Sequence, residues 1–246
     1  MIKYILGLIF VAVTSGCSSL EIKSAGVEVE KELKYITTQT STAHNPKPTI
    51  IVAHGCSGTA PFSYKEWVYS IGNWGYNSVM LDSFLARGFS NCERRAPPYL
   101  DQNVRARDIA NLAQWIKKQP WHTGKIGLIG FSHGGGAAIN VANNPEVKDI
   151  SAAVAYYPYC DLIGVDIKNP KIPVLIHFGK KDTTTPIDRC KINDKYEQIV
   201  YPNAYHSFDI YKVDGMYYGH WHAFDLEANM ISRQKTKEFM DKHLRN

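Results

Sequence analysis

The sequence predicts an α/β domain built on a mostly parallel sheet with helices on both faces. Short apolar runs recur along the chain, and such runs are typical of strands that are covered on both faces. Segments with helical spacing alternate with these runs, which is the pattern of a parallel sheet and its crossover helices. The 246 residues are 44% hydrophobic and 21% charged, as in ordinary globular proteins. No repeat or shift in composition divides the chain, so we expect one domain over residues 27–246.

The first part of this domain contains an edge strand, two buried strands and a helix. Val27–Ile36 leans toward alternation and predicts the edge strand, which a polar loop follows. Thr49–Ala53 is a short continuous apolar run, and Asn77–Leu81 is the next predicted buried strand. Between these two strands, Glu66–Trp74 has helical spacing, and Gly75 ends the helix.

A second helix and the central strand come next. Asp101 can cap this helix, and Pro120 lies just beyond its end. One face of the helix packs on the sheet, because four apolar residues recur at helical offsets: Ile109, Leu112, Ala113 and Ile116. The apolar run Ile126–Ile129 then predicts a strand, and Asn143, Asn144 and Pro145 end the helix that follows it.

The last part of the chain contains three more short strands and a long helix. The strands are predicted at Ala152–Tyr157, Val174–Phe178 and Glu197–Tyr201, and the helix spans Asp225–Leu244. The sequence does not decide whether the segment Asp209–Ala223 closes over a site as a lid.

The residues Gly130-Phe131-Ser132-His133-Gly134 form a Gly-x-Ser-x-Gly motif between the central strand and a helix of small residues. This context is typical of a nucleophile elbow, in which a sharp turn lifts the serine hydroxyl above the sheet. The positive end of the helix dipole then lies beneath any oxyanion that forms there. The motif therefore predicts Ser132 as a nucleophile; the alternative interpretation is a glycine-rich structural turn.

The partners of a catalytic serine are expected just past the ends of later strands, since sites in such sheets form at the carboxyl ends of the strands. Asp182 follows the fifth apolar run and His206 follows the sixth, which gives the serine, acid, histidine order of α/β-hydrolases. His206 would take the proton of Ser132, and Asp182 would orient the imidazole and stabilise its charged form. Asp161 also follows a strand and is the alternative acid.

Two backbone N–H groups are expected to form the oxyanion hole. One belongs to His133, directly after the nucleophile, and the other to Cys56, in the loop after Thr49–Ala53. His54 in this loop is predicted to be a structural buttress.

The other histidines point to no metal site. The side chain of His133 should point away from that of Ser132, although the two residues are adjacent. His220 and His222 form a His-x-His pair, but no third ligand with zinc-like spacing accompanies them, so we expect loop or lid residues. We expect neither a metal nor an organic cofactor.

The N-terminal residues have the outline of a secretory signal. Residues 1–16 contain Lys3, an apolar run of ten residues and a small-residue end. Cys17 resembles the lipidated cysteine of a bacterial lipobox, and residues 17–26 read as a tether. We therefore expect an envelope lipoprotein, with the outer membrane favoured; a periplasmic or secreted protein released by ordinary signal cleavage is the alternative.

Four further cysteines remain: Cys56, Cys92, Cys160 and Cys190. An even number of cysteines in an exported protein suggests two disulfides, and the sequence alone leaves three possible pairings.

Several segments together resemble the dienelactone hydrolase family of α/β-hydrolases. They are His54-Gly55-Cys56-Ser57-Gly58, Asp82-Ser83-Phe84 with Arg87-Gly88, Cys92, the elbow, Tyr156-Tyr157-Pro158-Tyr159-Cys160, Gly179 with Asp182, and Tyr201-Pro202-Asn203-Ala204-Tyr205-His206-Ser207-Phe208-Asp209. The likeness runs from about Thr49 to the C-terminal helix.

This resemblance implies the α/β-hydrolase fold, with Ser132 as nucleophile, Asp182 as acid and His206 as base. Members of the family typically use a cysteine nucleophile where this chain has serine. The family's strand order also implies two disulfides, Cys56–Cys92 and Cys160–Cys190.

The expected function is that of a serine esterase acting on a small ester or lactone through an acyl-enzyme. Tyr157, Tyr159 and Tyr205 are candidate pocket walls, although aromatic residues after buried strands often only pack. A peptidase or acyltransferase on the same fold, or a non-catalytic envelope lipoprotein, are the alternatives. Nucleic acid is not an expected partner, because the net charge is only +5 and the 28 basic residues are scattered.

Overall fold

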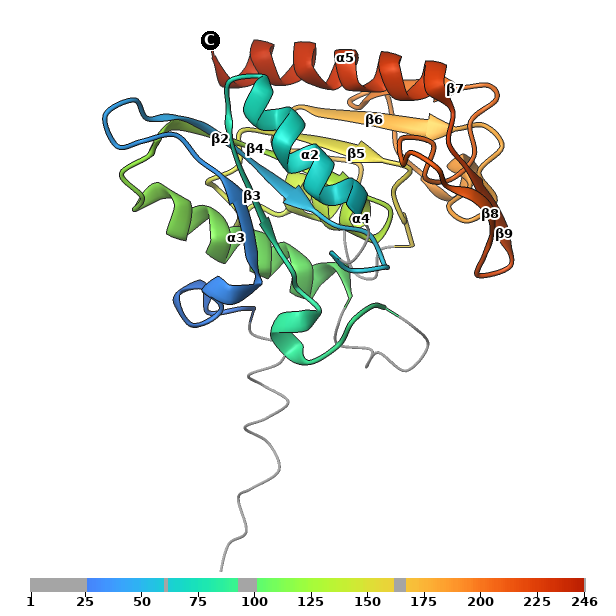
Figure 1. The fold of residues 1–246 in the computed structure, drawn as a ribbon. Helices are drawn as coiled ribbons and strands as arrows, with labels where there is room; N and C mark the ends of the chain where they lie inside the picture. The colour runs from blue at the N-terminus through green and yellow to red at the C-terminus, as the bar shows by residue number, and fades with distance from the viewer. Residues whose placement is uncertain (1–25, 60–61, 93–100, 162–166, 246) are drawn as a thin grey trace, which may run out of the picture.

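Seven strands form the main sheet of the molecule (Figure 1). In spatial order they are β1 (Ile36–Gln39), β3 (Asn77–Leu81), β2 (Lys47–Ala53), β4 (His122–Phe131), β5 (Ala152–Tyr156), β6 (Val174–Gly179) and β7 (Glu197–Tyr201). Every neighbouring pair is parallel except β1 and β3, which are antiparallel. The mostly parallel sheet expected from the apolar runs is confirmed.

The computed structural model describes residues 26–59, 62–92, 101–161 and 167–245. The predicted signal peptide at residues 1–16, the lipidation site Cys17 and all but the last residue of the predicted tether lie outside these ranges. Within them, no helix has the length and apolar character needed to cross a membrane.

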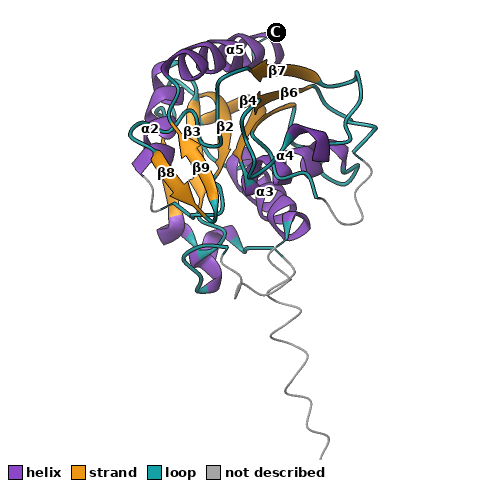
Figure 2. Ribbon diagram, turned by 90° about the vertical axis from the view of Figure 1, so that its right-hand side faces the viewer, coloured by secondary structure: helices purple, strands orange, loops and turns teal. Residues whose placement is uncertain are grey.

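Helices cover both faces of the sheet (Figures 1 and 2). On one face lie α2 (Phe62–Asn73) and α5 (Leu226–Leu244), whose residues Trp67, Ile71 and Met240 are buried with the sheet. On the other face lie α3 (Gln102–Lys117) and α4 (His133–Asn143), which share a second core with the opposite side of the strands. The predicted layers are thus confirmed.

The cap of α3 forms as the sequence predicts. The carboxylate of Asp101 accepts hydrogen bonds from the backbone N–H groups of Asn103 and Val104, at 2.9 and 3.0 Å. These bonds satisfy donors that have no partner inside the helix.

The predicted edge strand at Val27–Ile36 is wrong for most of its length. This segment forms two short 3-10 helices, η1 (Val29–Lys31) and η2 (Leu33–Tyr35), and strand β1 begins only at Ile36. The backbone N–H of Val27 donates to Asp108 Oδ1 of α3 at 2.8 Å. The segment therefore packs beside α3 and the alternation in its sequence reflects burial there, not pairing in the sheet.

The segment before α5 contains a hairpin that the sequence analysis did not predict. Strands β8 (Asp214–Tyr217) and β9 (His220–Ala223) pair with each other and lie apart from the main sheet, near the carboxyl end of β6 (Figure 1). Their two-residue turn has positive φ at Tyr218 (52°) and Gly219 (83°). Two positive φ angles define the type I′ turn that matches the twist of paired strands.

The structure contains two disulfides, Cys56–Cys92 and Cys160–Cys190, with Cα atoms 4.9 and 5.0 Å apart. These are the pairings that the family resemblance implied. Disulfides persist in oxidising compartments, so the two bonds indicate an exported location.

Candidate active site

The elbow at the end of β4 has the strained backbone that the motif predicts. Ser132 has φ 52° and ψ −114°, and it directly precedes the first residue of α4. A Cβ added to Gly130 would collide with the backbone of Gly134, and one added to Gly134 would collide with the backbone of Ala53. The turn therefore requires glycine at both flanking positions, and the hydroxyl of Ser132 stands at the carboxyl end of the sheet.

Three predicted residues from distant parts of the chain meet at this end of the sheet. His206 Nε2 lies 3.1 Å from Ser132 Oγ, and His206 Nδ1 lies 2.7 Å from Asp182 Oδ2. The carboxylate accepts a hydrogen bond from Nδ1–H, which leaves Nε2 free to accept the proton of the serine hydroxyl. The structure thus brings together the serine, histidine and acid in the order of contacts that a catalytic triad requires.

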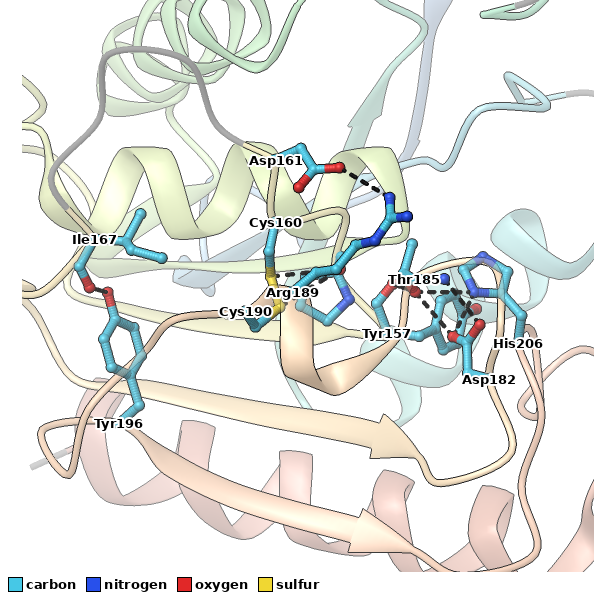
Figure 3. The surroundings of a disulfide bond; sticks show 11 residues. Tyr157, Cys160, Asp161, Ile167, Asp182, Thr185, Arg189, Cys190, Tyr196 and His206 are labelled. Atoms are coloured by element: carbon cyan, nitrogen blue, oxygen red, sulfur yellow. Dashed lines mark hydrogen bonds and ion pairs between the residues drawn. A yellow bond between two sulfur atoms is a disulfide. The ribbon is translucent and has the colours of Figure 1, made fainter.

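The loop after β6 holds the carboxylate of Asp182 in place. Oδ1 accepts backbone N–H bonds from Thr184 and Thr185 at 2.8 and 2.9 Å, and Oδ2 accepts the hydroxyl of Thr185 at 2.8 Å. Figure 3 shows Asp182, Thr185 and His206 turned toward one another. Burial opposes ionisation of this carboxyl, but the bonds from His206 and Thr185 outweigh burial and lower the pKa of Asp182.

The alternative acid, Asp161, does not contact His206. Its carboxylate pairs with Arg189 Nη1 at 3.3 Å, and both side chains are about half exposed (Figure 3). Asp161 lies at the cavity wall instead. The geometry therefore favours Asp182 as the orienting acid.

The loop after β2 lies directly beside the serine. A Cβ built on Gly55 would stand 3.5 Å from the Cβ of Ser132. His54 is fully buried, contacts its neighbour's carbonyl at Gly55 through Nδ1 (2.8 Å), and accepts the N–H of Ser83 at Nε2 (3.2 Å). Burial lowers the pKa of His54 to about 3, so it stays neutral and supports the loop, as predicted.

Cys56 and His133, the residues predicted to supply the oxyanion donors, both line the same cavity as Ser132. Cys56 follows Gly55 in this loop, and its carbonyl accepts the N–H of Cys92 at 2.8 Å, beside their disulfide. His133 is the first residue of α4, where a helix leaves its backbone donors free. The His133 ring contacts Arg105 Nη1 at 3.1 Å and stacks on Tyr159, so it takes no part in the triad.

A cavity of about 730 Å³ opens beside Ser132 and His206. Of the three tyrosines suggested as walls, only Tyr159 lines it. Tyr157 is buried behind His206, and Tyr205 is not among the lining residues and lies near Lys181 instead. The lining also includes residues that the sequence analysis did not single out, among them Tyr64, Gln102, Ile210, Val213, Tyr217 and Tyr218.

The His-x-His pair lies on β9 and contacts the loop that carries Asp182. His220 Nδ1 lies 2.9 Å from Thr183 Oγ1, and His222 Nε2 lies 3.0 Å from Thr184 Oγ1. Across the ranges that the structure describes, no group of three or more His, Cys, Asp or Glu side chains is arranged to hold a metal ion.

Fold and site together define a protein of the α/β-hydrolase class, with a serine–histidine–aspartate contact at the carboxyl end of a parallel sheet. The sequence pattern of the dienelactone hydrolase family matches residues 35–244. The chain belongs to the dienelactone hydrolase family.

Individual relatives agree with this assignment. The chain is 33% identical over 224 residues to the "Putative carboxymethylenebutenolidase" of Yersinia pestis, covering 78% of this chain and 79% of that protein. It is 26% identical over 162 residues to the carboxymethylenebutenolidase of Pseudomonas putida, covering 59% of this chain and 65% of that protein. The second match thus spans less than two thirds of that relative.

Among solved structures, the "Putative Dienelactone Hydrolase" from Klebsiella pneumoniae has a TM-score of 0.67 at 18% identity, covering 85% of this chain and 98% of that chain. A dienelactone hydrolase from Anabaena variabilis has a TM-score of 0.61 at 17% identity, covering 85% and 99%. These two likenesses show the fold.

Proposed function

We propose that this protein is a serine hydrolase that cleaves a carboxylic ester or lactone through an acyl-enzyme. The observation that carries the proposal is the hydrogen-bonded series from Ser132 through His206 to Asp182, at 3.1 and 2.7 Å. A lone serine is a weak nucleophile near neutral pH, and an oriented imidazole overcomes that weakness. Family membership supports an ester or lactone as the substrate.

The first half of the proposed reaction forms the acyl-enzyme. Ser132 Oγ attacks the substrate carbonyl carbon while His206 Nε2 takes its proton. The carbonyl electrons move to oxygen, and the N–H groups of Cys56 and His133 donate to that oxyanion. When the oxyanion collapses, His206 gives its proton to the leaving alkoxide, and the acyl group stays on Ser132.

The second half repeats these steps with water. His206 removes a proton from a water molecule, whose oxygen attacks the acyl carbon. The second oxyanion collapses, Ser132 regains its proton, and the acid is released. Asp182 stays ionised throughout, which agrees with its lowered pKa, and it stabilises the imidazolium in both halves.

Labelling with a fluorophosphonate probe tests the proposal. The wild-type protein should become covalently labelled, whereas S132A and H206A should not. Circular dichroism then shows whether the two variants are folded. A folded wild-type protein that neither takes the label nor hydrolyses any ester would contradict the proposal and favour a non-catalytic envelope protein.

A substrate panel separates the related activities. We expect turnover of p-nitrophenyl esters of short and medium acyl chains and little turnover of aminoacyl amides. Faster cleavage of the amides would identify a peptidase, and transfer of the acyl group to an added alcohol in preference to water would identify an acyltransferase.

The N-terminal segment supports a second, independent proposal about location. We infer that residues 1–16 are removed on export and that Cys17 carries a lipid that anchors the protein to the bacterial envelope. Radiolabelled palmitate should enter the wild-type chain but not C17S. Incorporation into neither chain would leave a periplasmic or secreted protein.

A further inference from the structure

The hairpin of β8 and β9 lies against His206, the general base of the proposed triad. The backbones of His206 and His222 form an isolated parallel bridge, so the hairpin is joined to the loop that follows β7. Alternate residues of a strand point to opposite sides. His220 and His222 face the site, whereas Trp221 lies between them, is 43% exposed and does not line the cavity.

The side chain of His222 links two loops that carry members of the triad. Its Nε2 lies 3.0 Å from Thr184 Oγ1, and its Nδ1 lies 3.3 Å from Ser207 Oγ. The N–H of Thr184 donates to Asp182 Oδ1 at 2.8 Å. Ser207 directly follows His206 and has a positive φ of 61°. One imidazole thus connects the loop of the acid to the loop of the base.

The same imidazole contacts the ring of His206, with centroids 4.7 Å apart. His222 is buried, and burial is the main reason that its pKa falls to about 4. The titratable groups that face it are His206, Asp182 and His220, with the ring of Tyr217 at 5.2 Å. Near neutral pH the ring of His222 is therefore uncharged, and it shields His206 from solvent without adding a positive charge beside the imidazolium.

We propose that His222 is a positioning residue, which holds the imidazole of His206 in line with Ser132 and Asp182 by joining Thr184 to Ser207. This inference rests on the proposed function, because it assigns a role within the same site. The hairpin then serves as a support for the base as well as a wall of the cavity. A displacement of the imidazole by about 1 Å can cost roughly 10²-fold in rate.

Substitutions at His222 and at its partner Thr184 separate the role of the His222 ring from that of its hydrogen bonds. H222F keeps a flat ring against His206 and removes both bonds, and its kcat for a p-nitrophenyl ester should fall roughly 10- to 100-fold, with KM changed less than about twofold. T184V should also have a lower kcat than the wild type, because it removes the bond between Thr184 Oγ1 and His222. T184S keeps the hydroxyl and should have a kcat close to that of the wild type. W221F, on the same strand but facing away, is the matched control and should match the wild type.

A spectroscopic readout distinguishes positioning from a general loss of structure. The proton between His206 Nδ1 and Asp182 should give a low-field NMR resonance in the wild type and in W221F. In H222F this resonance should broaden or disappear, while the circular dichroism spectrum stays unchanged.

The outcomes separate the two proposals. Absence of Ser132-dependent turnover in the wild type would defeat the proposed function itself. Normal wild-type turnover, with H222F equal to W221F in both kcat and the low-field resonance, would overturn the role of His222 alone. If H222F does not fold, the comparison of T184V with T184S decides, and equal kcat values for those two variants would likewise overturn the inference.

Discussion

The ring of Tyr157 lies against the imidazole of His206, with ring centroids 4.5 Å apart. Tyr157 has a positive φ of 35°, and its hydroxyl donates to Asp209, which also accepts the indole N–H of Trp67 at 2.7 Å. Tyr157, Asp209 and Trp67 are all buried. The proposed base is therefore supported by a polar network that reaches helix α2, and this network limits how far the imidazole can move.

Replacement of the proposed acid should separate orientation from folding. In D182N the neutral amide lacks the charge that stabilises the imidazolium, and its NH2 group can donate to Nδ1 and favour the wrong tautomer, so kcat should fall by roughly 10³ to 10⁴. D161N should lower kcat by less than about tenfold, because Asp161 lies at the cavity wall and not against His206. Steady-state kinetics of both variants on one ester provide the measurement. The proposed assignment fails if D161N shows the larger loss.

Acid should destabilise the fold through buried neutral histidines. Burial lowers the pKa of His177 to about 3, whereas an unfolded histidine titrates near 6.5. Between these values the unfolded chain binds the additional proton, so stability is lost as the pH falls from about 6.5 toward 3. The loss is about 1.4 kcal/mol per pH unit for each such residue.

Urea unfolding at several pH values between 7 and 4 measures this dependence. In H177Q the slope of the unfolding free energy against pH should fall by about 1.4 kcal/mol per pH unit, which corresponds to one proton, whatever the effect of the substitution on stability at pH 7. Parallel slopes for the wild type and H177Q would show that His177 is not the group responsible.

The disulfide between Cys56 and Cys92 should support both stability and activity. The bond closes a loop with a sequence separation of 36, and closing such a loop is worth about 4 kcal/mol in the chain-entropy view. The double variant C56S/C92S should therefore unfold at lower urea concentration. Its kcat should also fall, because the disulfide holds the loop that carries the N–H of residue 56, which is one of the two proposed oxyanion donors.

The double variant C160S/C190S is the matched comparison, since its disulfide has a similar sequence separation of 30. It should lose a similar amount of stability and less kcat, because neither cysteine supplies an oxyanion donor. Equal losses of kcat would argue against the role given to Cys56.

The hairpin tyrosines should determine which esters fit. Tyr217 and Tyr218 line the cavity although both are exposed, at 47% and 62%. Aromatic walls of this kind contribute apolar contact to a bulky substrate. Y218A should therefore raise KM for an aromatic ester by roughly threefold to tenfold, which corresponds to the loss of one partly buried ring, and change KM for p-nitrophenyl acetate less.

Tyr211 provides the control for this measurement. It is 65% exposed, packs edge-on against Phe224 and does not line the cavity. Y211A should leave KM unchanged for both esters. If Y218A and Y211A change KM alike, Tyr218 does not contact the bound ester.

The sheet and the contact among Ser132, His206 and Asp182 could be predicted because their signals are local. Buried strands such as Val174–Phe178 are continuous apolar runs, and the elbow has a fixed pattern of glycines around Ser132. Asp182 and His206 were identified from their places after the fifth and sixth apolar runs. Parallel topology then brings them together, because neighbouring strands end at the same edge.

The N-terminal segment and the hairpin could not be predicted, because their structures depend on distant partners. In the segment Val27–Ile36, Val29 is buried and the backbone N–H of Val27 donates to Asp108 of α3. No local sequence pattern reveals this contact with a distant helix. The hairpin turn is Tyr218-Gly219, and tyrosine is not a residue that type I′ turns favour at their first position. Gly219 between two aromatic stretches was the one signal that could have indicated it.

Cys56 contributes to the molecule in two ways at once: its sulfur is bound to Cys92, and its amide is a proposed donor to the oxyanion. A chain that folds in a reducing cytosol lacks the Cys56–Cys92 disulfide beside that donor. We therefore expect freshly synthesised precursor to be a poor catalyst and to reach full turnover only after oxidation. Recombinant protein for the assays above should accordingly be produced in the periplasm or refolded with a glutathione couple, and its thiols should be counted before any rate is compared.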